Sequence, residues 1–137
     1  MSLELLVDEM KETIEAGEHA LLLLKKAQAK LKHASSLSLA DLFGAGALSA
    51  MIKRSKMCEA QSIMEDAKIE LRLFQQELML VEIPVNLSLE VNDFLVFADV
   101  FFEGFMADYL VPAKLTFTKE QIAEAIGRVE RILQELK

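Results

Sequence analysis

The chain has 137 residues, of which 53% are apolar and 27% are charged, and its net charge at pH 7 is −7. The apolar share excludes a disordered chain, and the acidic balance argues against a nucleic-acid binder, which needs a basic face. Because Cys58 is the only cysteine, an intrachain disulfide is excluded. Together with an acidic N-terminus unlike a secretory signal, this predicts a single cytoplasmic domain over residues 1–137.

The first predicted element is one long helix from Ser2 to about His33. Its seam residues recur at alternating spacings of four and three, the heptad pattern of a helix packed along its length. These residues are Leu3, Val7, Met10, Ile14, Gly17, Leu21, Leu24, Gln28 and Leu31. Because about thirty residues make a helix about 45 Å long, this helix is expected to overhang a monomeric bundle or to pack against a partner.

The segment 34–46 changes character. Its serines at 35, 36 and 38 predict a loop, followed by a short turn over residues 39–43. Gly44 and Gly46 permit the close backbone approach of a tight turn. A phosphate-binding loop is disfavoured, because the Gly-Lys-Ser/Thr ending is missing and no strand precedes it. We therefore expect a tight turn here.

A short helical insert over residues 47–54 and a second heptad segment follow the glycines. Residues 47–81 are compatible with two helices, the second capped by Ser55, or with one unbroken helix. The second heptad repeat comprises Met57, Ala60, Met64, Ala67, Leu71, Phe74, Leu78 and Val81. Pro84 ends this helix, and residues 82–87 are predicted to be a connector.

The third long helix is predicted over about residues 89–110, opened by Asn86 or Ser88. It is apolar nearly all round, which is typical of a helix at the centre of a bundle. Its polar residues form two narrow strips, one with Asn92, Asp99 and Glu103 and the other with Glu90, Asp93 and Asp108. Residues 94–111 are the most apolar stretch, but their acids disfavour a transmembrane span. We therefore expect a buried helix.

The last helix is predicted to begin at Thr118, with Gln121 completing a capping box. Its buried stripe is predicted to comprise Ile122, Ala125, Ile126, Val129, Ile132, Leu133 and Leu136. No strand pattern occurs anywhere in the chain. The predicted fold is therefore all-α: four principal antiparallel helices in a bundle, with a short helical insert between the first and the second.

Two stretches of the chain carry a family resemblance. The first combines Asp-Leu-Phe-Gly-Ala-Gly-Ala-Leu-Ser at 41–49, Lys-Arg-Ser-Lys at 53–56 and Glu-Ala-Gln at 59–61; the second is Phe-Ala-Asp-Val-Phe-Phe-Glu-Gly-Phe-Met-Ala-Asp-Tyr at 97–109. Together they resemble an uncharacterised family of small all-helical proteins from low-GC Gram-positive bacteria. The resemblance implies a helical fold and a bacterial cytosol, but no catalytic residue, since the family has no assigned activity. Pro112 departs from the family's pattern, in which a polar residue other than proline stands there.

Asp99 and Glu103 are the strongest candidates for a binding site. Their i, i+4 spacing places two carboxylates on one face of an apolar helix, where they would hold a hard metal ion or act as an acid and base. The simpler interpretation is that they reach solvent or pair with basic residues. Residues 82–111 contain six acids and no base, whereas residues 34–56 contain three bases and one acid. This contrast predicts an ion pair that joins Lys53 or Arg54 to Asp99 or Glu103.

No catalytic constellation and no cofactor motif occurs in the sequence. The leading prediction is therefore a non-enzymatic helical interaction module that self-associates as a homodimer or binds another protein. The alternatives are a small-ligand or metal-binding bundle that uses the third helix, and an enzyme built on Asp99 and Glu103. An exposed apolar stripe on the first helix would favour the interaction module. A cavity beside Phe97, Phe101 and Phe105 would favour ligand binding.

Overall fold

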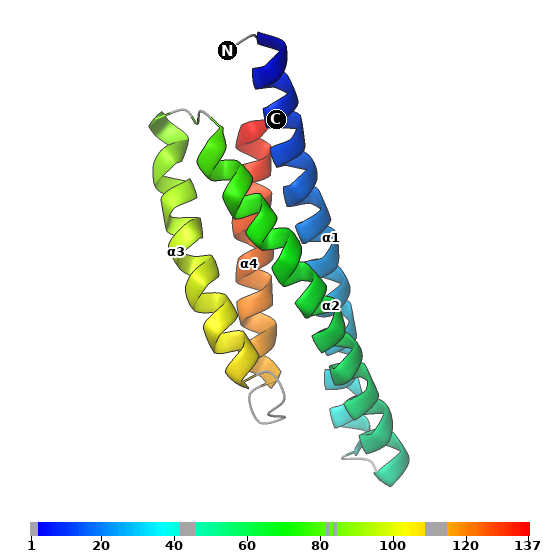
Figure 1. Ribbon diagram of the computed structural model, residues 1–137. Coiled ribbons are helices and arrows are strands. Elements are labelled where there is room, and N and C mark those ends of the chain that lie inside the picture. The colour runs from blue at the N-terminus through cyan, green and yellow to red at the C-terminus, as the bar shows by residue number, and fades with distance from the viewer. Residues whose placement is uncertain (1–2, 42–45, 82, 84, 109–114) are drawn as a thin grey trace.

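The computed structural model describes residues 3–41, 46–81, 83, 85–108 and 115–137. Within these ranges the chain forms four α-helices and no β-strand. The helices are α1 (Leu3–Asp41), α2 (Gly46–Leu80), α3 (Val85–Asp108) and α4 (Leu115–Leu136). Consecutive helices run in opposite directions, and α1 and α2 form a hairpin much longer than the pair of α3 and α4 (Figure 1). This arrangement confirms the predicted all-α bundle.

The α1–α2 hairpin is held together by a seam of small side chains. The buried alanines of this seam are Ala16, Ala20, Ala27 and Ala34 of α1 and Ala60 and Ala67 of α2. Small side chains let two helix backbones approach closely, and larger residues such as Leu24 and Met64 fill the remaining space. His19 Nδ1 lies 3.9 Å from Glu70 Oε2, and Lys30 Nζ lies 2.9 Å from Glu59 Oε2. His19 and Lys30 are eleven residues apart on α1, and their partners Glu70 and Glu59 are eleven residues apart on α2. The two helices therefore keep the same antiparallel register between these two pairs.

The heptad prediction is confirmed for α2 and half right for α1. All seven predicted residues of α2 from Met57 to Leu78 are buried, and Val81 is half-buried. In α1 the column that contains Gly17, Leu24 and Leu31 is also buried. The second predicted column is not, because Val7 is exposed and the next three residues, at 14, 21 and 28, are only half-buried. Ala20, Ala27 and Ala34, on the other side of the Leu24 column, are buried instead. Their small side chains allow α1 to approach α2 more closely than larger residues would.

The predicted loop at the serines is wrong, and of the two alternatives for residues 47–81 the structure has the single unbroken helix and no separate insert. α1 continues as a helix through the serines at 35, 36 and 38 to Asp41, and α2 is one unbroken helix from Gly46 to Leu80. Ala34 and Met57 are both buried near this end of the hairpin. Packing between the helices therefore outweighs the weak preference of serine for turns. Gly46 is the first residue of α2, whereas Gly44 lies outside the described residues, as does Pro112.

The last two helices begin earlier than the sequence predicted. α3 begins at Val85, so residues 85–87 of the predicted connector are helical. α4 begins at Leu115, and Thr118 is therefore a buried residue of the first turn and not the N-cap. The predicted stripe of α4 is confirmed: its six residues from Ile122 to Leu133 are buried and Leu136 is half-buried. This stripe packs α4 against both α1 and α3.

α3 lies at the edge of the bundle and not at its centre, which corrects the prediction from its composition. It packs against α4 and, over a smaller contact, against α2 (Figure 1). On the α2 side, the rings of Phe74 and Phe94 lie 5.7 Å apart, and Gln75 Nε2 donates to the Leu95 carbonyl oxygen at 3.5 Å. The inner face of α3 is buried by these contacts. Its outer face is exposed to solvent and carries apolar residues, such as Leu89 and Val96, beside polar ones, such as Asn92 and Asp99.

Glu59 forms ion pairs with two lysines of the α1–α2 hairpin. Lys30 Nζ lies 2.9 Å and Lys56 Nζ 3.5 Å from Glu59 Oε2. The hydrogen bond from Lys30 and the charges of both lysines lower the pKa of the Glu59 carboxyl from its ordinary value of 4.5, against a smaller opposing effect of desolvation. A lowered pKa means that the folded state binds this proton less readily than the unfolded state does. The contribution to stability is therefore present above pH 4.5 and is lost as the pH falls through the lowered value.

Glu59→Gln is accordingly expected to lower the melting temperature slightly at pH 7 and by a smaller amount at pH 3. At the lower pH a larger fraction of the wild-type carboxyl is neutral, and the neutral carboxyl resembles the glutamine. The measurement is thermal unfolding of both proteins, followed by circular dichroism at the two pH values. Glu65→Gln, at an exposed position of the same helix, is the control and should leave the melting temperature unchanged at both pH values. An equal decrease in the melting temperature of Glu59→Gln at both pH values would contradict the inference that the Glu59 charge stabilises the fold.

Candidate functional site

Asp99 and Glu103 lie one turn apart on α3, and both side chains are exposed. Two exposed carboxylates offer an incoming cation only part of the six to eight oxygen ligands that calcium takes. Among the residues that the structure describes, no three His, Cys, Asp or Glu side chains are placed to hold a metal ion. The geometry of this pair is therefore that of a solvated acidic strip.

The structure does not bring Lys53 and Arg54 to these carboxylates. Lys53 is half-buried and Arg54 is exposed in the first turns of α2, the part of the hairpin that extends beyond α3 and α4 (Figure 1). Within the described ranges no ion pair joins either residue to Asp99 or Glu103. Exposed carboxylates are solvated by water, so they do not require the compensating charge that a buried acid would need.

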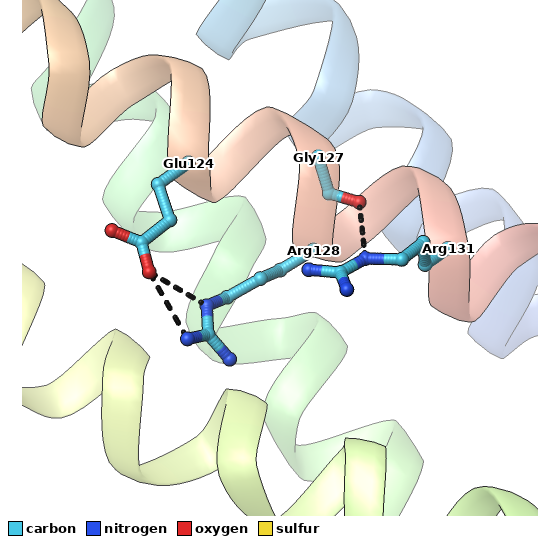
Figure 2. A network of polar contacts seen from close by, with 4 residues as sticks. All are labelled: Glu124, Gly127, Arg128 and Arg131. Atoms are coloured by element: carbon cyan, nitrogen blue, oxygen red, sulfur yellow. Dashed lines mark hydrogen bonds and ion pairs between the residues drawn. The ribbon is translucent and has the colours of Figure 1, made fainter.

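The basic residues that face α3 come from α4, and the sequence analysis missed them. Glu90 and Asp93 of α3 and Arg128, Arg131 and Ile132 of α4 line one groove of about 200 Å³. Figure 2 shows the two arginine side chains on α4, with Arg128 extending toward α3. The absence of bases in residues 82–111 did signal a basic neighbour. The signal did not say which helix would supply it.

Arg128 is fixed by three contacts. Its Nε and Nη2 donate to Glu124 Oε1 at 3.2 Å and 3.0 Å (Figure 2). Its Cζ lies 4.7 Å from the centroid of the Phe97 ring, which is a cation–π distance. Phe97 in turn stacks on Phe101 with a centroid separation of 5.6 Å. The Arg128 side chain therefore covers part of the phenylalanine pair and links α4 to α3.

Arg131 is held less tightly and keeps most of its donors available. Its Nε donates to the Gly127 carbonyl oxygen at 3.4 Å, and the residue is exposed (Figure 2). In the described part of the chain it forms no ion pair. The groove thus presents two guanidinium groups beside two carboxylates. This mixed charge gives no preference for a phosphate, but it suits a surface that carries both signs.

A second groove lies near the amino end of α1. It has a volume of about 500 Å³, its apolar lining comes from Val7, Met10 and Ile14, and its charged lining from Lys11, Glu15 and Glu18. Val7 is 60% exposed, and Met10 and Ile14 are half-buried. The amino end of α1 extends past the end of α4 (Figure 1). The overhang predicted from the length of the first helix is therefore present, and its seam residues are partly open to solvent.

None of the described helices is long and apolar enough to cross a membrane, in agreement with the prediction for residues 94–111 over their described part. No protein-family model matches the chain, and no match was found among curated proteins or among solved structures. The resemblance to a bacterial helical family therefore stays a prediction.

Proposed function

We propose that the protein is a non-enzymatic helical module that acts by binding protein through apolar helix faces, and that it self-associates as a homodimer in the bacterial cytoplasm. The observation that carries this proposal is the apolar groove on α1. Val7, Met10 and Ile14 continue the apolar spacing of the first helix into a segment that extends beyond α4. Met10 and Ile14 are half-buried and Val7 is exposed, so the bundle covers this apolar surface only in part. A partly covered apolar surface is a typical feature of a protein-binding site.

The energy available at such a surface supports the proposal. Burying one side chain the size of valine, isoleucine or methionine contributes about 1.5–3 kcal/mol. The outer face of α3 adds further exposed apolar residues, notably Val85 and Leu89. The acidic strip of Asp99 and Glu103 is exposed, and the described residues hold no metal-binding cluster. The observations therefore favour protein binding over chemistry at these carboxylates.

Native mass spectrometry of the full chain, purified without chelators, tests this function. We expect a dimer with nothing bound, for the wild type and for the Asp99→Asn, Glu103→Gln double variant alike. A stoichiometric extra mass in the wild type that is lost in the double variant would overturn the proposal. It would establish the alternative, a small-ligand or metal-binding bundle that uses the third helix. A monomer at every concentration would contradict the self-association.

A further inference from the structure

We propose that the outer face of α3 is the dimer interface, on which α3 of a second copy of the chain packs antiparallel about a two-fold axis beside Asn92. This inference rests on the proposed self-association and assigns it to a surface other than the α1 groove. The surface is defined here as the α3 stripe, which comprises Val85, Leu89, Val96 and Val100.

The α3 stripe is an apolar ridge on the side of α3 that faces away from the core. Its members are 65–88% exposed, and they share one face because spacings of four and seven residues return to the same side of a helix. The buried residues of α3, such as Phe94 and Ala98, lie on the opposite face. The sequence therefore carries two apolar faces on one helix, of which the bundle uses only one. A second face of this kind has no role in the isolated chain.

The pattern of the α3 stripe fits a second copy of itself. A two-fold interface places each residue of one copy opposite a residue that mirrors it across the axis. Val85 and Val100 are equally distant from the midpoint between Asn92 and Asp93, and so are Leu89 and Val96. An antiparallel pair of α3 helices centred there places Val85 of each copy level with Val100 of the other, and Leu89 level with Val96. All four residues of the stripe are then matched.

The residue at the centre of the stripe also suits a two-fold axis. Asn92 is exposed and lies on the same outer side of α3 as the stripe. A two-fold axis brings this residue next to its own copy. An asparagine amide both donates and accepts hydrogen bonds, so it can pair with itself, whereas a charged residue would repel its copy. A polar asparagine within an apolar helix seam also fixes the register of the two helices.

Charge complementarity on one flank of the stripe points to the same partner. Asp93 lies on the flank that faces α4, where Glu90 and Arg131 line the groove described above. Around a two-fold axis, the same flank of each copy lies side by side. Two Asp93 carboxylates would thus approach each other, and Arg131 of each copy lies on the flank where it can pair with them. Arg131 is exposed, and among the described residues its one hydrogen bond is made through Nε, so its other donors are open to a partner.

The groove on α1 is a poorer surface for a second copy. Its charged lining consists of the acids Glu15 and Glu18 and one basic residue, Lys11. Two further acids, Asp8 and Glu12, are exposed on the same helical segment. Two copies that meet there would bring like charges together, which is unfavourable.

The α3 stripe has an apolar centre and one flank of both signs. Asp99 and Glu103 are exposed beside it, but an antiparallel axis next to Asn92 keeps each of them far from its own copy. The α3 stripe is therefore the better surface for self-association.

The expected dimer is weak, because one helix face buries less than the roughly 1,200 Å² of a standard interface. The average molecular mass in solution should therefore rise with protein concentration, with a dissociation constant on the order of micromolar. Sedimentation velocity of the full chain over a range of concentrations therefore measures the wild type and the variants. Circular dichroism confirms that each variant is folded, which is expected because every changed residue is exposed.

Val96→Asp and Ile69→Glu form a matched pair of variants. Val96 is 67% exposed on α3 and Ile69 is 66% exposed on the outer side of α2, so each variant places a carboxylate at an equally open position. We expect Val96→Asp to weaken the dimer at least tenfold and Ile69→Glu to leave it unchanged. A dimer that survives Val96→Asp but dissociates with Ile69→Glu would overturn the inference while self-association stands.

A cross-linking experiment tests the position of the axis. In a Cys58→Ser background, which removes the exposed native thiol, Asn92→Cys should give a covalent dimer with a short bis-maleimide reagent. Ile69→Cys in the same background is the control and should remain monomeric on a denaturing gel. Efficient cross-linking at 69 and not at 92 would overturn the inference. A wild-type chain that is monomeric throughout would overturn both the inference and the proposed self-association, so the two failures are distinguishable.

Discussion

Phe74→Ala is expected to lower the free energy of unfolding by about 3–5 kcal/mol, because it removes a fully buried aromatic ring from a close-packed core. Phe74 lies on α2 at the point where the helices converge. Its ring contacts Phe94 of α3 in a tilted arrangement with a centroid separation of 5.7 Å. A Cβ built on Gly17 of α1 would lie 2.8 Å from the same ring and equally close to Leu133 of α4. One side chain therefore joins all four helices.

Leu73→Ala is the matched control for this substitution. Leu73 precedes Phe74 directly, but it lies on the outer side of α2 and is 43% exposed. Its removal is expected to cost less than about 1 kcal/mol. Urea denaturation of the two variants and the wild type, followed by circular dichroism, gives the comparison. A similar decrease in the free energy of unfolding for both variants would mean that the face of α2 with Phe74 does not pack against the other helices.

The parts of the fold that were predicted correctly are those in which large apolar side chains repeat at helical spacing. The α2 seam from Met57 to Leu78 and the α4 stripe from Ile122 to Leu136 are of this kind. A large side chain in such a pattern gains more from burial than any neighbour, so the pattern alone identifies the buried face. The number of helices and their antiparallel order followed from these patterns and from the short connections between them.

The errors in the fold have a different cause, since they depend on what each helix meets. In α1 the alanines at 20, 27 and 34 are buried in place of the larger residues at 14, 21 and 28. Their advantage is a closer approach to the alanines of α2, which no property of α1 alone reveals. The serines at 35, 36 and 38 are helical although serine favours turns. Tertiary packing overrides a weak local preference in both cases.

The candidate site was only partly predictable for a related reason. The excess of acids on α3 suggested a basic neighbour, but charge counting cannot distinguish Lys53 and Arg54 from Arg128 and Arg131. The packing of the helices distinguishes the two pairs, because α4 packs beside α3 and the first turns of α2 do not. In the same way, the apolar outer face of α3 was read as buried. The proposed dimer would account for this composition, since the second apolar face of α3 would be buried between the two copies.

Gly17→Ala and Gly127→Ala are expected to change stability in opposite directions, although both replace a helical glycine. Alanine is favoured over glycine in a helix interior by about 1 kcal/mol. At Gly127 the new methyl group meets nothing within 4 Å, so we expect this full gain. At Gly17 the Cβ would lie 2.8 Å from both Leu133 Cδ2 and Phe74 Cε1.

Because Phe74 and Leu133 are buried, neither can move away from the methyl group at Gly17 without displacing other core residues. Such overpacking costs about 1–3 kcal/mol, against a gain of about 1 kcal/mol in helix propensity. Urea denaturation should therefore place Gly17→Ala below the wild type by up to about 2 kcal/mol and Gly127→Ala above it. Equal stabilisation by the two substitutions would mean that α1 lies farther from α2 and α4 than this packing requires. The sign of the Gly17 effect thus tests whether α1 is seated against Phe74 and Leu133, the contact from which its amino end extends to form the exposed groove.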